Sequence, residues 1–369
     1  MKNRKLFAAL GLTSALFLTA CGGGDAEEAA AEGIDPAAVE GLGGEDAAAE
    51  FEELYASAIE DGQDVVTIYT PLTATWPQVF EAFEERFPEI SVEPLQVVGA
   101  ELDTKVSQEM ASGQVIADLV LTGDTGVVGL ADKDTFMEYR PFNAEDITSD
   151  EEFSLESGTL TAISASPRGF VYDTRQEDEI VPESWEDLLD PSLKGKIVMD
   201  QPATDGGGLQ MTDLILNDDR LGRDYLEDLA DQDLTISSTT AECHNMVVQG
   251  RAYVCLMGAM GNYMTLTGEG APVEIVHPID GGNWATYFYG GIVDDAPNPD
   301  AGKLFMSWVN SPEANEAKAG AGSGPVTNAE GLDLPFENPG DLDQLERPAL
   351  SEITDRNAES MPVMDEIFN

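Results

Sequence analysis

Short apolar runs of strand length alternate along most of the chain with longer segments in which apolar residues recur at helical spacing. The strand-like runs lie at residues 65–69, 90–97, 117–122, 196–199 and 252–256. The helix-like segments lie at 76–87, 101–112 and 124–131, near 185, and at 207–216, 239–249, 259–267, 299–309 and 312–319. Regular alternation of this kind is typical of a mostly parallel sheet covered by helices. The pattern therefore predicts an α/β fold.

Two longer extended stretches, at residues 160–173 and 284–293, interrupt this alternation. Because the roughly 300 residues after position 62 exceed what one hydrophobic core usually serves, we expect two lobes with these stretches crossing between them. The predicted limits are residues 63–165 with 284–320 for lobe 1, 166–283 for lobe 2, and 321–369 for C-terminal helices that pack on a lobe. A ligand cleft is then expected between the lobes, at the carboxyl ends of the strands.

The first residues have the order of an export signal. Lys2, Arg4 and Lys5 precede an apolar run at 6–18, which is shorter than the ~20 residues needed to span a bilayer. Residues 22–62 then consist largely of Gly, Ala, Glu and Asp with few aromatic residues, and such a composition buries little apolar surface. We therefore expect an acidic tether over 22–62, with a short helix around 47–59.

The end of the signal, LTAC at residues 18–21 followed by GGG, resembles the lipobox of bacterial lipoproteins. The resemblance implies that residues 1–21 are a lipoprotein signal peptide and that Cys21 is lipidated. It also implies export, with the protein held at the outer face of the cell membrane or in the periplasm. The alternative is that Cys21 merely ends a hydrophobic helix.

Two further cysteines, Cys243 and Cys255, lie close together in the sequence. In an oxidising compartment such a pair is most simply a disulfide, which stabilises a short loop by roughly 2 to 3 kcal/mol. The alternative is a thiol metal site, which needs more sulfur or histidine nearby than His244 supplies.

The charge of the chain excludes one class of partner. It contains 71 acidic and 18 basic residues, a formal net charge of −53. Such a surface repels DNA, RNA and anionic lipid, so nucleic-acid binding is excluded. The acidic residues are spread among normal apolar content, which indicates a solvated surface suited to high salt and to a halophilic source.

One segment carries a family resemblance: PESWEDLLDP at 182–191 with LKGKI at 193–197 is similar to a recurring segment of periplasmic solute-binding proteins. The ferric-iron-binding group is the most similar, and the likeness runs from about residue 65 to 320, including GFVYD at 169–173 and PNPDAGK at 297–303. It implies a two-lobed periplasmic-binding-protein fold of type II, each lobe a mostly parallel sheet flanked by helices, with a central cleft. It also implies closure around a ligand and its delivery to the permease and ATPase subunits of an ABC importer, and we expect the protein to be a monomer.

The same resemblance makes ferric iron the alternative ligand. Iron binders of this group present adjacent tyrosines, a histidine after the first strand and an acidic residue at the second helix, and these oxygen-rich sets suit ferric iron. The resemblance places Tyr263 and Glu101 at two of these positions. Met264 replaces the second tyrosine, and the loop at 69–75 has no histidine. Two expected ligands are therefore missing, so no metal site is favoured.

Hydroxyl and glycine residues at the expected strand ends suit an anion instead. Thr70 and Thr73 precede a helix, whose N-terminal N–H groups attract negative charge, and Arg168 on the first crossing stretch suits a bidentate pair with a carboxylate or phosphate. The predicted ligand-binding residues are Thr70, Thr73, Glu101, Thr122, Asp124, Arg168, Thr204, Asp205, Gly206, Tyr263 and Tyr287. The alternatives are ordinary caps and turns, an ion pair of Arg168 with a surface acid, and core packing of Tyr287.

Enzyme motifs are missing from the sequence. It has no Gly-x-Ser-x-Gly, His-Glu-x-x-His or Gly-x-x-x-x-Gly-Lys pattern, and these patterns supply a nucleophile, a metal site and a phosphate loop. We therefore expect a binding protein without cofactor or catalytic residues. The expected solute is a small organophosphate, phosphonate or carboxylate. Two rival functions are those of a secreted hydrolase and of a lipoprotein that serves attachment alone.

A salt series tests the halophilic interpretation. Because salt screens repulsion between like charges, we expect the thermal midpoint of the purified protein to be higher in molar salt than in dilute buffer. Equal midpoints in the two solutions would contradict this interpretation.

Overall fold

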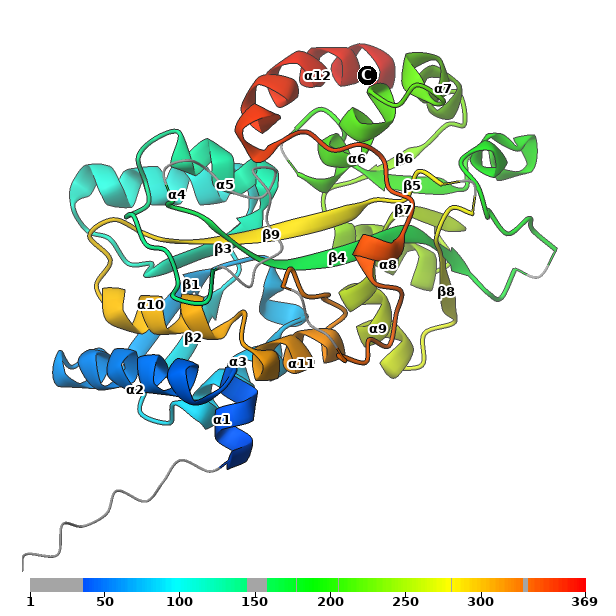
Figure 1. Cartoon of the computed structure of the whole chain (residues 1–369). Helices are drawn as coiled ribbons and strands as arrows, with labels where there is room; N and C mark the ends of the chain where they lie inside the picture. Colours follow the sequence, from blue (N-terminus) through cyan, green and yellow to red (C-terminus); the bar gives the residue numbers. More distant parts are fainter. Residues whose placement is uncertain (1–35, 145–157, 177, 205, 280, 328–330) are drawn as a thin grey trace, which may run out of the picture. The chain divides into compact units, whose positions relative to one another are not determined.

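The computed structural model describes residues 36–144, 158–176, 178–204, 206–279, 281–327 and 331–369 (Figure 1). The predicted signal peptide and Cys21 lie outside these residues, as does Asp205. Across the described ranges, no helix has the length and apolar character needed to cross a membrane. All of the elements below belong to one compact unit, residues 36–369.

The strands in the described part of the chain join in one sheet. Its order is β2 (Ser91–Leu95), β1 (Val65–Tyr69), β3 (Leu119–Gly123), β9 (Ala285–Ile292), β4 (Thr161–Asp173), β7 (Val254–Ala259), β5 (Ile197–Asp200) and β6 (Thr235–Ser237), with β8 (Val273–Val276) beside β4. β1 runs parallel to β2 and β3, and β5 runs parallel to β6 and β7. These two parallel groups are the centres of lobe 1 and lobe 2.

β4 belongs to both lobes. Its first half, from Thr161 to Pro167, pairs antiparallel with β9, whereas Arg168 onward pairs with β7 and β8. The expected α/β fold and the expected crossing at 160–173 are therefore confirmed. The sequence pattern missed β6 and β8, because three or four residues are too few to show a period.

Helices cover both groups of strands. Lobe 1 has α3 (Pro77–Arg86), α4 (Gly99–Ser112), α5 (Asp124–Ala131), α10 (Pro299–Trp308) and α11 (Pro312–Gly320). Lobe 2 has α6 (Gly207–Leu216), α7 (Gly222–Ala230), α8 (Thr240–Val248) and α9 (Met260–Gly268). Near 185 the chain forms only a 3₁₀ turn, Glu186–Leu189, and α7 was not predicted.

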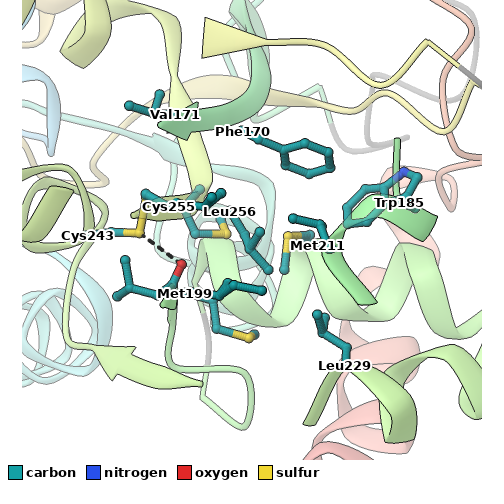
Figure 2. Close-up of a cluster of buried hydrophobic side chains, with 14 of the residues drawn as sticks. Phe170, Val171, Trp185, Met199, Met211, Leu229, Cys243, Cys255 and Leu256 are labelled. Atoms are coloured by element: carbon teal, nitrogen blue, oxygen red, sulfur yellow. Dashed lines mark hydrogen bonds between the residues drawn. A yellow bond between two sulfur atoms is a disulfide. The ribbon is translucent and has the colours of Figure 1, made fainter. Parts of the chain in front are cut away.

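Aromatic side chains fill a separate core in each lobe. In lobe 1, the ring centroid of Phe83 lies 5.0 Å from that of Phe305 and 5.4 Å from that of Trp308. In lobe 2, Trp185 packs edge-on against Phe170, with ring centroids 5.0 Å apart. Figure 2 shows the two side chains within this core. Full burial of one such side chain contributes roughly 1.5 to 3 kcal/mol. The tryptophan of the PESWEDLLDP segment is therefore a core residue.

The tether expected over residues 22–62 is wrong for its second half. Residues 36–60 form α1 (Pro36–Leu42) and α2 (Glu45–Glu60), and α2 packs on α10 of lobe 1. Ala48, Phe51 and Ala58 are buried, and Phe51 meets Phe142 edge-on at 4.9 Å. The few apolar residues of this acidic segment recur at helical spacing, and that stripe is enough to dock the helix.

The C-terminal segment also departs from expectation, because it packs on both lobes. It ends in α12 (Ile353–Phe368), which contacts α5 of lobe 1 and α6 and α7 of lobe 2. Thr354 donates to Asp132 on the lobe 1 side at 2.9 Å, and Arg356 donates to Asp213 of α6 at 2.7 Å. The prediction that residues 321–369 pack on a single lobe is therefore wrong for α12.

The predicted disulfide is confirmed. Cys243 of α8 and Cys255 of β7 are bonded, with their Cα atoms 5.6 Å apart. Both side chains are fully buried in lobe 2. The bond ties α8 to the central strand of that lobe.

Removing this bond should destabilise lobe 2. For Cys243→Ala with Cys255→Ala, we expect the free energy of unfolding to fall by about 3 kcal/mol, because the unfolded chain regains the freedom of the closed loop. Urea unfolding of the native and doubly substituted proteins measures the difference. An unchanged urea midpoint would contradict a stabilising role.

Lys318 of α11 is a fully buried lysine. Its Nζ donates to the carbonyl oxygen of Ile163 at 2.6 Å and to Asn310 Oδ1 at 3.3 Å. Burial lowers the pKa of Lys318 to about 7. The neutral form is therefore favoured far more in the folded protein than in the unfolded chain, where the pKa is near 10.5.

Lys318 should give stability a measurable pH dependence. Because the folded pKa lies below the unfolded one, the unfolded chain binds more protons between these values, so the contribution to stability rises with pH from about 7 to 10.5. We expect the stability difference between native protein and Lys318→Met to change by up to ~1.4 kcal/mol per pH unit in this window. Urea unfolding at several pH values measures it, and a difference independent of pH would contradict the assignment.

Candidate ligand-binding site

Arg168 lies where β4 passes from lobe 1 to lobe 2, opposite Ala259 of β7. Its side chain is buried, with 6% of the residue exposed. Nε donates to Thr286 Oγ1 at 2.9 Å, whereas Nη1 is buried and has no hydrogen-bond partner among the described residues. Burial lowers the pKa of Arg168 to about 10, and the charges of Asp200 and Asp124 oppose that fall. A buried guanidinium with an unused donor is costly unless an anion meets it.

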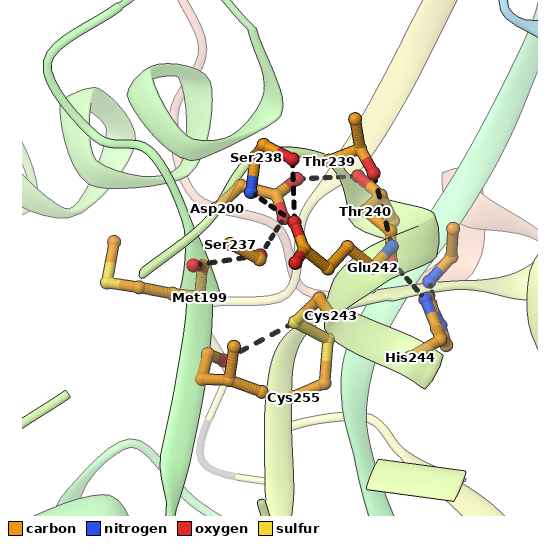
Figure 3. The surroundings of a disulfide bond; sticks show 12 residues. Met199, Asp200, Ser237, Ser238, Thr239, Thr240, Glu242, Cys243, His244 and Cys255 are labelled. Carbon is orange, nitrogen blue, oxygen red and sulfur yellow. Dashed lines mark hydrogen bonds between the residues drawn. A yellow bond between two sulfur atoms is a disulfide. The ribbon is translucent and has the colours of Figure 1, made fainter. Parts of the chain in front are cut away.

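Asp200 ends β5 on the lobe 2 side of this arginine. Figure 3 shows its carboxylate held by two hydroxyl groups. Ser237 donates to Oδ1 at 2.8 Å, and Thr240 at the start of α8 donates to Oδ2 at 2.6 Å. Burial raises the pKa of Asp200, while these hydrogen bonds and the charge of Arg168 lower it. The carboxylate influences Arg168 through its charge without pairing with it directly.

His244 of α8 joins the same region to β7. Its Nδ1 lies 2.8 Å from the carbonyl oxygen of Thr240, and its Nε2 accepts from the N–H of Ala259 at 3.3 Å. Nδ1 must therefore be the donor in a neutral ring. Burial lowers the pKa of His244 to about 4, and Arg168 adds to the fall. The histidine is thus a neutral structural residue.

Two hydrogen bonds join the lobes beside Arg168. Gln210 of α6 donates from Nε2 to Oδ2 of Asp124, the first residue of α5, at 2.9 Å. Thr286 of β9 donates to Gln210 Oε1 at 2.8 Å. Arg168, Thr286, Gln210 and Asp124 therefore form a continuous series that runs from the crossing strand to both lobes.

A small cavity lies between this series of residues and the C-terminal segment of the chain. Its volume is about 20 Å³, and its lining includes Asp124, Gln210, Trp284, Arg347 and Asn357. This space suits about one water molecule. It is too small for a solute of the expected size.

The predicted hydroxyl residues of lobe 1 mostly serve its own turns. Thr70 is fully buried and accepts from the N–H of Leu72. Thr73 is half-buried and bonds to Gln96 at 3.3 Å. Thr122 is buried at the end of β3. Thr122 thus lies two residues before Asp124, while Thr70 is bonded within its own turn and Thr73 to Gln96, which is 23 residues away.

The other predicted residues are dispersed. Glu101 and Thr204 are exposed, Tyr263 is half-buried against the lobe 2 core, and Gly206 precedes α6 with φ of 145°. Tyr287 is committed to Arg347, whose guanidinium lies 4.2 Å from the ring centroid. Within the described ranges, His, Cys, Asp and Glu form no group of three or more that could hold a metal ion.

Sequence reasoning missed four residues that surround Arg168 or Asp124. They are Asp200, Gln210, Thr286 and Arg347. Asp200 follows a buried strand, as Asp124 does, and that signal was available. Thr286 alternates with Tyr287 on the second crossing stretch, so it faces the opposite side of the sheet. Nothing in the local pattern marks Gln210 or Arg347.

Known proteins match most of this chain. The family described as bacterial extracellular solute-binding proteins matches residues 69–316. A Haemophilus influenzae protein described as uncharacterized is 30% identical over 140 residues, which cover 37% of this chain and 39% of that protein. The match thus spans well under half the length of that relative.

Solved structures of periplasmic binding proteins share the fold. AfuA from Actinobacillus pleuropneumoniae, with fructose-6-phosphate bound, has a TM-score of 0.69 at 21% identity, covering 82% of this chain and 98% of AfuA. Iron-bound HitA from Pseudomonas aeruginosa has a TM-score of 0.65 at 18% identity, covering 82% of this chain and 99% of HitA.

These likenesses confirm the predicted two-lobed fold of the type II periplasmic binding proteins. The family match covers more than half of the sequence and includes β4, Arg168 and most of both lobes. This chain therefore belongs to the bacterial extracellular solute-binding proteins.

Proposed function

We propose that this protein captures a small anionic solute between its lobes and delivers it unchanged to the permease of an ABC importer. The solute class is an organophosphate, phosphonate or carboxylate. The observation that carries the proposal is Arg168, whose buried Nη1 has no hydrogen-bond partner in the described part of the chain. A phosphate or carboxylate supplies both the missing acceptor and the missing charge. AfuA, which shares the fold, has a sugar phosphate bound.

Binding of this anion would take place at the strand that both lobes share. The guanidinium is fixed on one side by Thr286, so its remaining N–H groups have a set direction toward the solute. Because β4 continues from one lobe into the other, a solute held at Arg168 contacts both. Closure of the lobes around it would then produce the form that the permease accepts.

Ferric iron, or a ferric-anion complex, is the second candidate, and it is favoured by the shared fold with iron-bound HitA. Tyr263 and Glu101 are the residues that would serve it. Tyr263 is half-buried and Glu101 is exposed, and no hydrogen bond links them to one another. A visible tyrosinate-to-iron absorption band on adding ferric iron would favour this candidate over the anion.

The remaining features of the proposal concern location and partners. Cys21 would carry the lipid anchor, and the residues between it and α1 would form the tether. The permease and ATPase subunits of the importer are the expected partners of a monomeric binding protein. We infer that it is not an enzyme, because its family binds and releases solutes; a secreted hydrolase is a remote alternative.

Substitution of Arg168 tests the anion site. We expect Arg168→Ala to weaken binding of an anionic solute at least tenfold, or ~1.4 kcal/mol, because the paired donors are lost. Calorimetry with fructose 6-phosphate, inorganic phosphate, an alkyl phosphonate and a dicarboxylate measures affinity. Arg251→Ala removes the same charge from an exposed position and should leave affinity unchanged.

The same substitution has an expected signature in stability. Because burial of an unpaired charge is unfavourable, the thermal midpoint of Arg168→Ala without solute should not fall far below that of the native protein. A loss of affinity with retained stability supports a ligand-binding role. Equal affinities of native protein and Arg168→Ala for every anion would remove Arg168 from the site.

A further inference from the structure

Gln210 of lobe 2 connects Arg168, through Thr286, with Asp124 of lobe 1. It lies in the first turn of α6 and is 9% exposed. Its amide touches Thr286, the partner of Arg168, at one end and Asp124 of lobe 1 at the other. We propose that Gln210 positions Arg168 for its anion and also latches the two lobes, so that solute capture and lobe closure are coupled. The positioning role rests on the proposed function, whereas the latch does not.

The chemistry of the groups permits only one orientation of this series. Arg168 Nε is a donor, so the Thr286 hydroxyl must accept from it at 2.9 Å. The single hydroxyl hydrogen of Thr286 is then free for Gln210 Oε1, at 2.8 Å. This fixes the amide of Gln210 with Nε2 toward the carboxylate of Asp124, at 2.9 Å. Each of these three hydrogen bonds then joins one donor to one acceptor.

The latch is the hydrogen bond between Gln210 and Asp124, and both residues are held by rigid surroundings. Gln210 belongs to a helix that is buried along nearly its whole length. Asp124 begins α5, accepts from the N–H of Thr125 at 2.8 Å and pairs with Arg347 at 3.3 Å. Because a hydrogen bond weakens steeply beyond ~3.5 Å, a small separation of the lobes breaks the contact between Gln210 and Asp124. The hydrogen bond between Gln210 and Asp124 therefore forms only when the two lobes are close together.

Solute capture and lobe closure are coupled because Thr286 bonds to both Arg168 and Gln210. With the latch formed, Thr286 is fixed by Gln210, and Arg168 is fixed by Thr286. With the latch broken, the amide of Gln210 is free to turn away, and Arg168 loses its defined direction toward an anion. An anion therefore binds the latched arrangement better, and by reciprocity it favours latching.

A charge substitution with a designed rescue tests this proposal. Gln210→Glu keeps an acceptor for Thr286 but places a second carboxylate against Asp124, and the repulsion should separate the lobes. Adding Asp124→Asn restores a donor and acceptor pair and should reverse the effect. Gln108→Glu, at an exposed position of α4, adds the same charge away from the latch and serves as the control.

Small-angle scattering of the full chain without solute measures the separation. We expect a larger radius of gyration for Gln210→Glu than for native protein or the control, and a return toward the native value in the double variant. Gln210→Leu removes both hydrogen bonds without adding charge and should give a smaller increase. It serves as the test if Gln210→Glu does not fold. Equal radii for native protein and these variants would overturn the latch.

Calorimetry with fructose 6-phosphate and inorganic phosphate completes the test. We expect Gln210→Glu to weaken whichever anion the native protein binds, and the double variant to recover part of the affinity. If native protein and Gln210→Glu bind an anion equally well, the positioning role is wrong while the proposed function stands. If no anion binds the native protein but the scattering change remains, the proposed function and the positioning role both fail, and only the latch survives.

Discussion

Arg168 is buried at the point where β4 leaves one lobe and enters the other, with a terminal nitrogen that no described residue satisfies. Burial lowers its pKa only to about 10, so it remains a cation at neutral pH. Burial of this partly unpaired cation is unfavourable, and it accounts for the placement of most other residues of the candidate site. Asp200 and Asp124 are placed to moderate the charge from both lobes, and neither is close enough to cancel it by direct pairing.

The surrounding structure is organised to keep that residue in place. The disulfide ties α8 to β7, and His244 links the same helix to Ala259, which lies opposite Arg168 on the sheet. On the other side, Arg347 pairs with Asp124 and stacks on Tyr287. Since α12 contacts helices of both lobes, the C-terminal segment joins them beside the crossing strands. Movement between the lobes must therefore strain these contacts as well.

The sequence predicted the architecture better than the site. Alternating strand and helix periods are local properties, and two unusually long extended runs sufficed to locate the crossing at 160–173. A short helix around 47–59 was expected and is part of α2, but its docking on lobe 1 was not predicted, because the acidic composition hid the apolar stripe of Ala48, Phe51 and Ala58. The partners of Arg168 could not be predicted, because Thr286 and Gln210 are 118 and 42 positions away from it in the chain, and hydrogen bonds across such separations leave no local pattern. Arg347 was overlooked for the same reason.

Native mass spectrometry of freshly purified full-length protein tests the central claim most directly. If Arg168 holds an anionic solute, a fraction of the native protein should carry a small organic phosphate, phosphonate or carboxylate, and Arg168→Ala prepared in parallel should carry none. A co-purified ferric ion, a neutral or cationic solute, or the same anion on both proteins would contradict it.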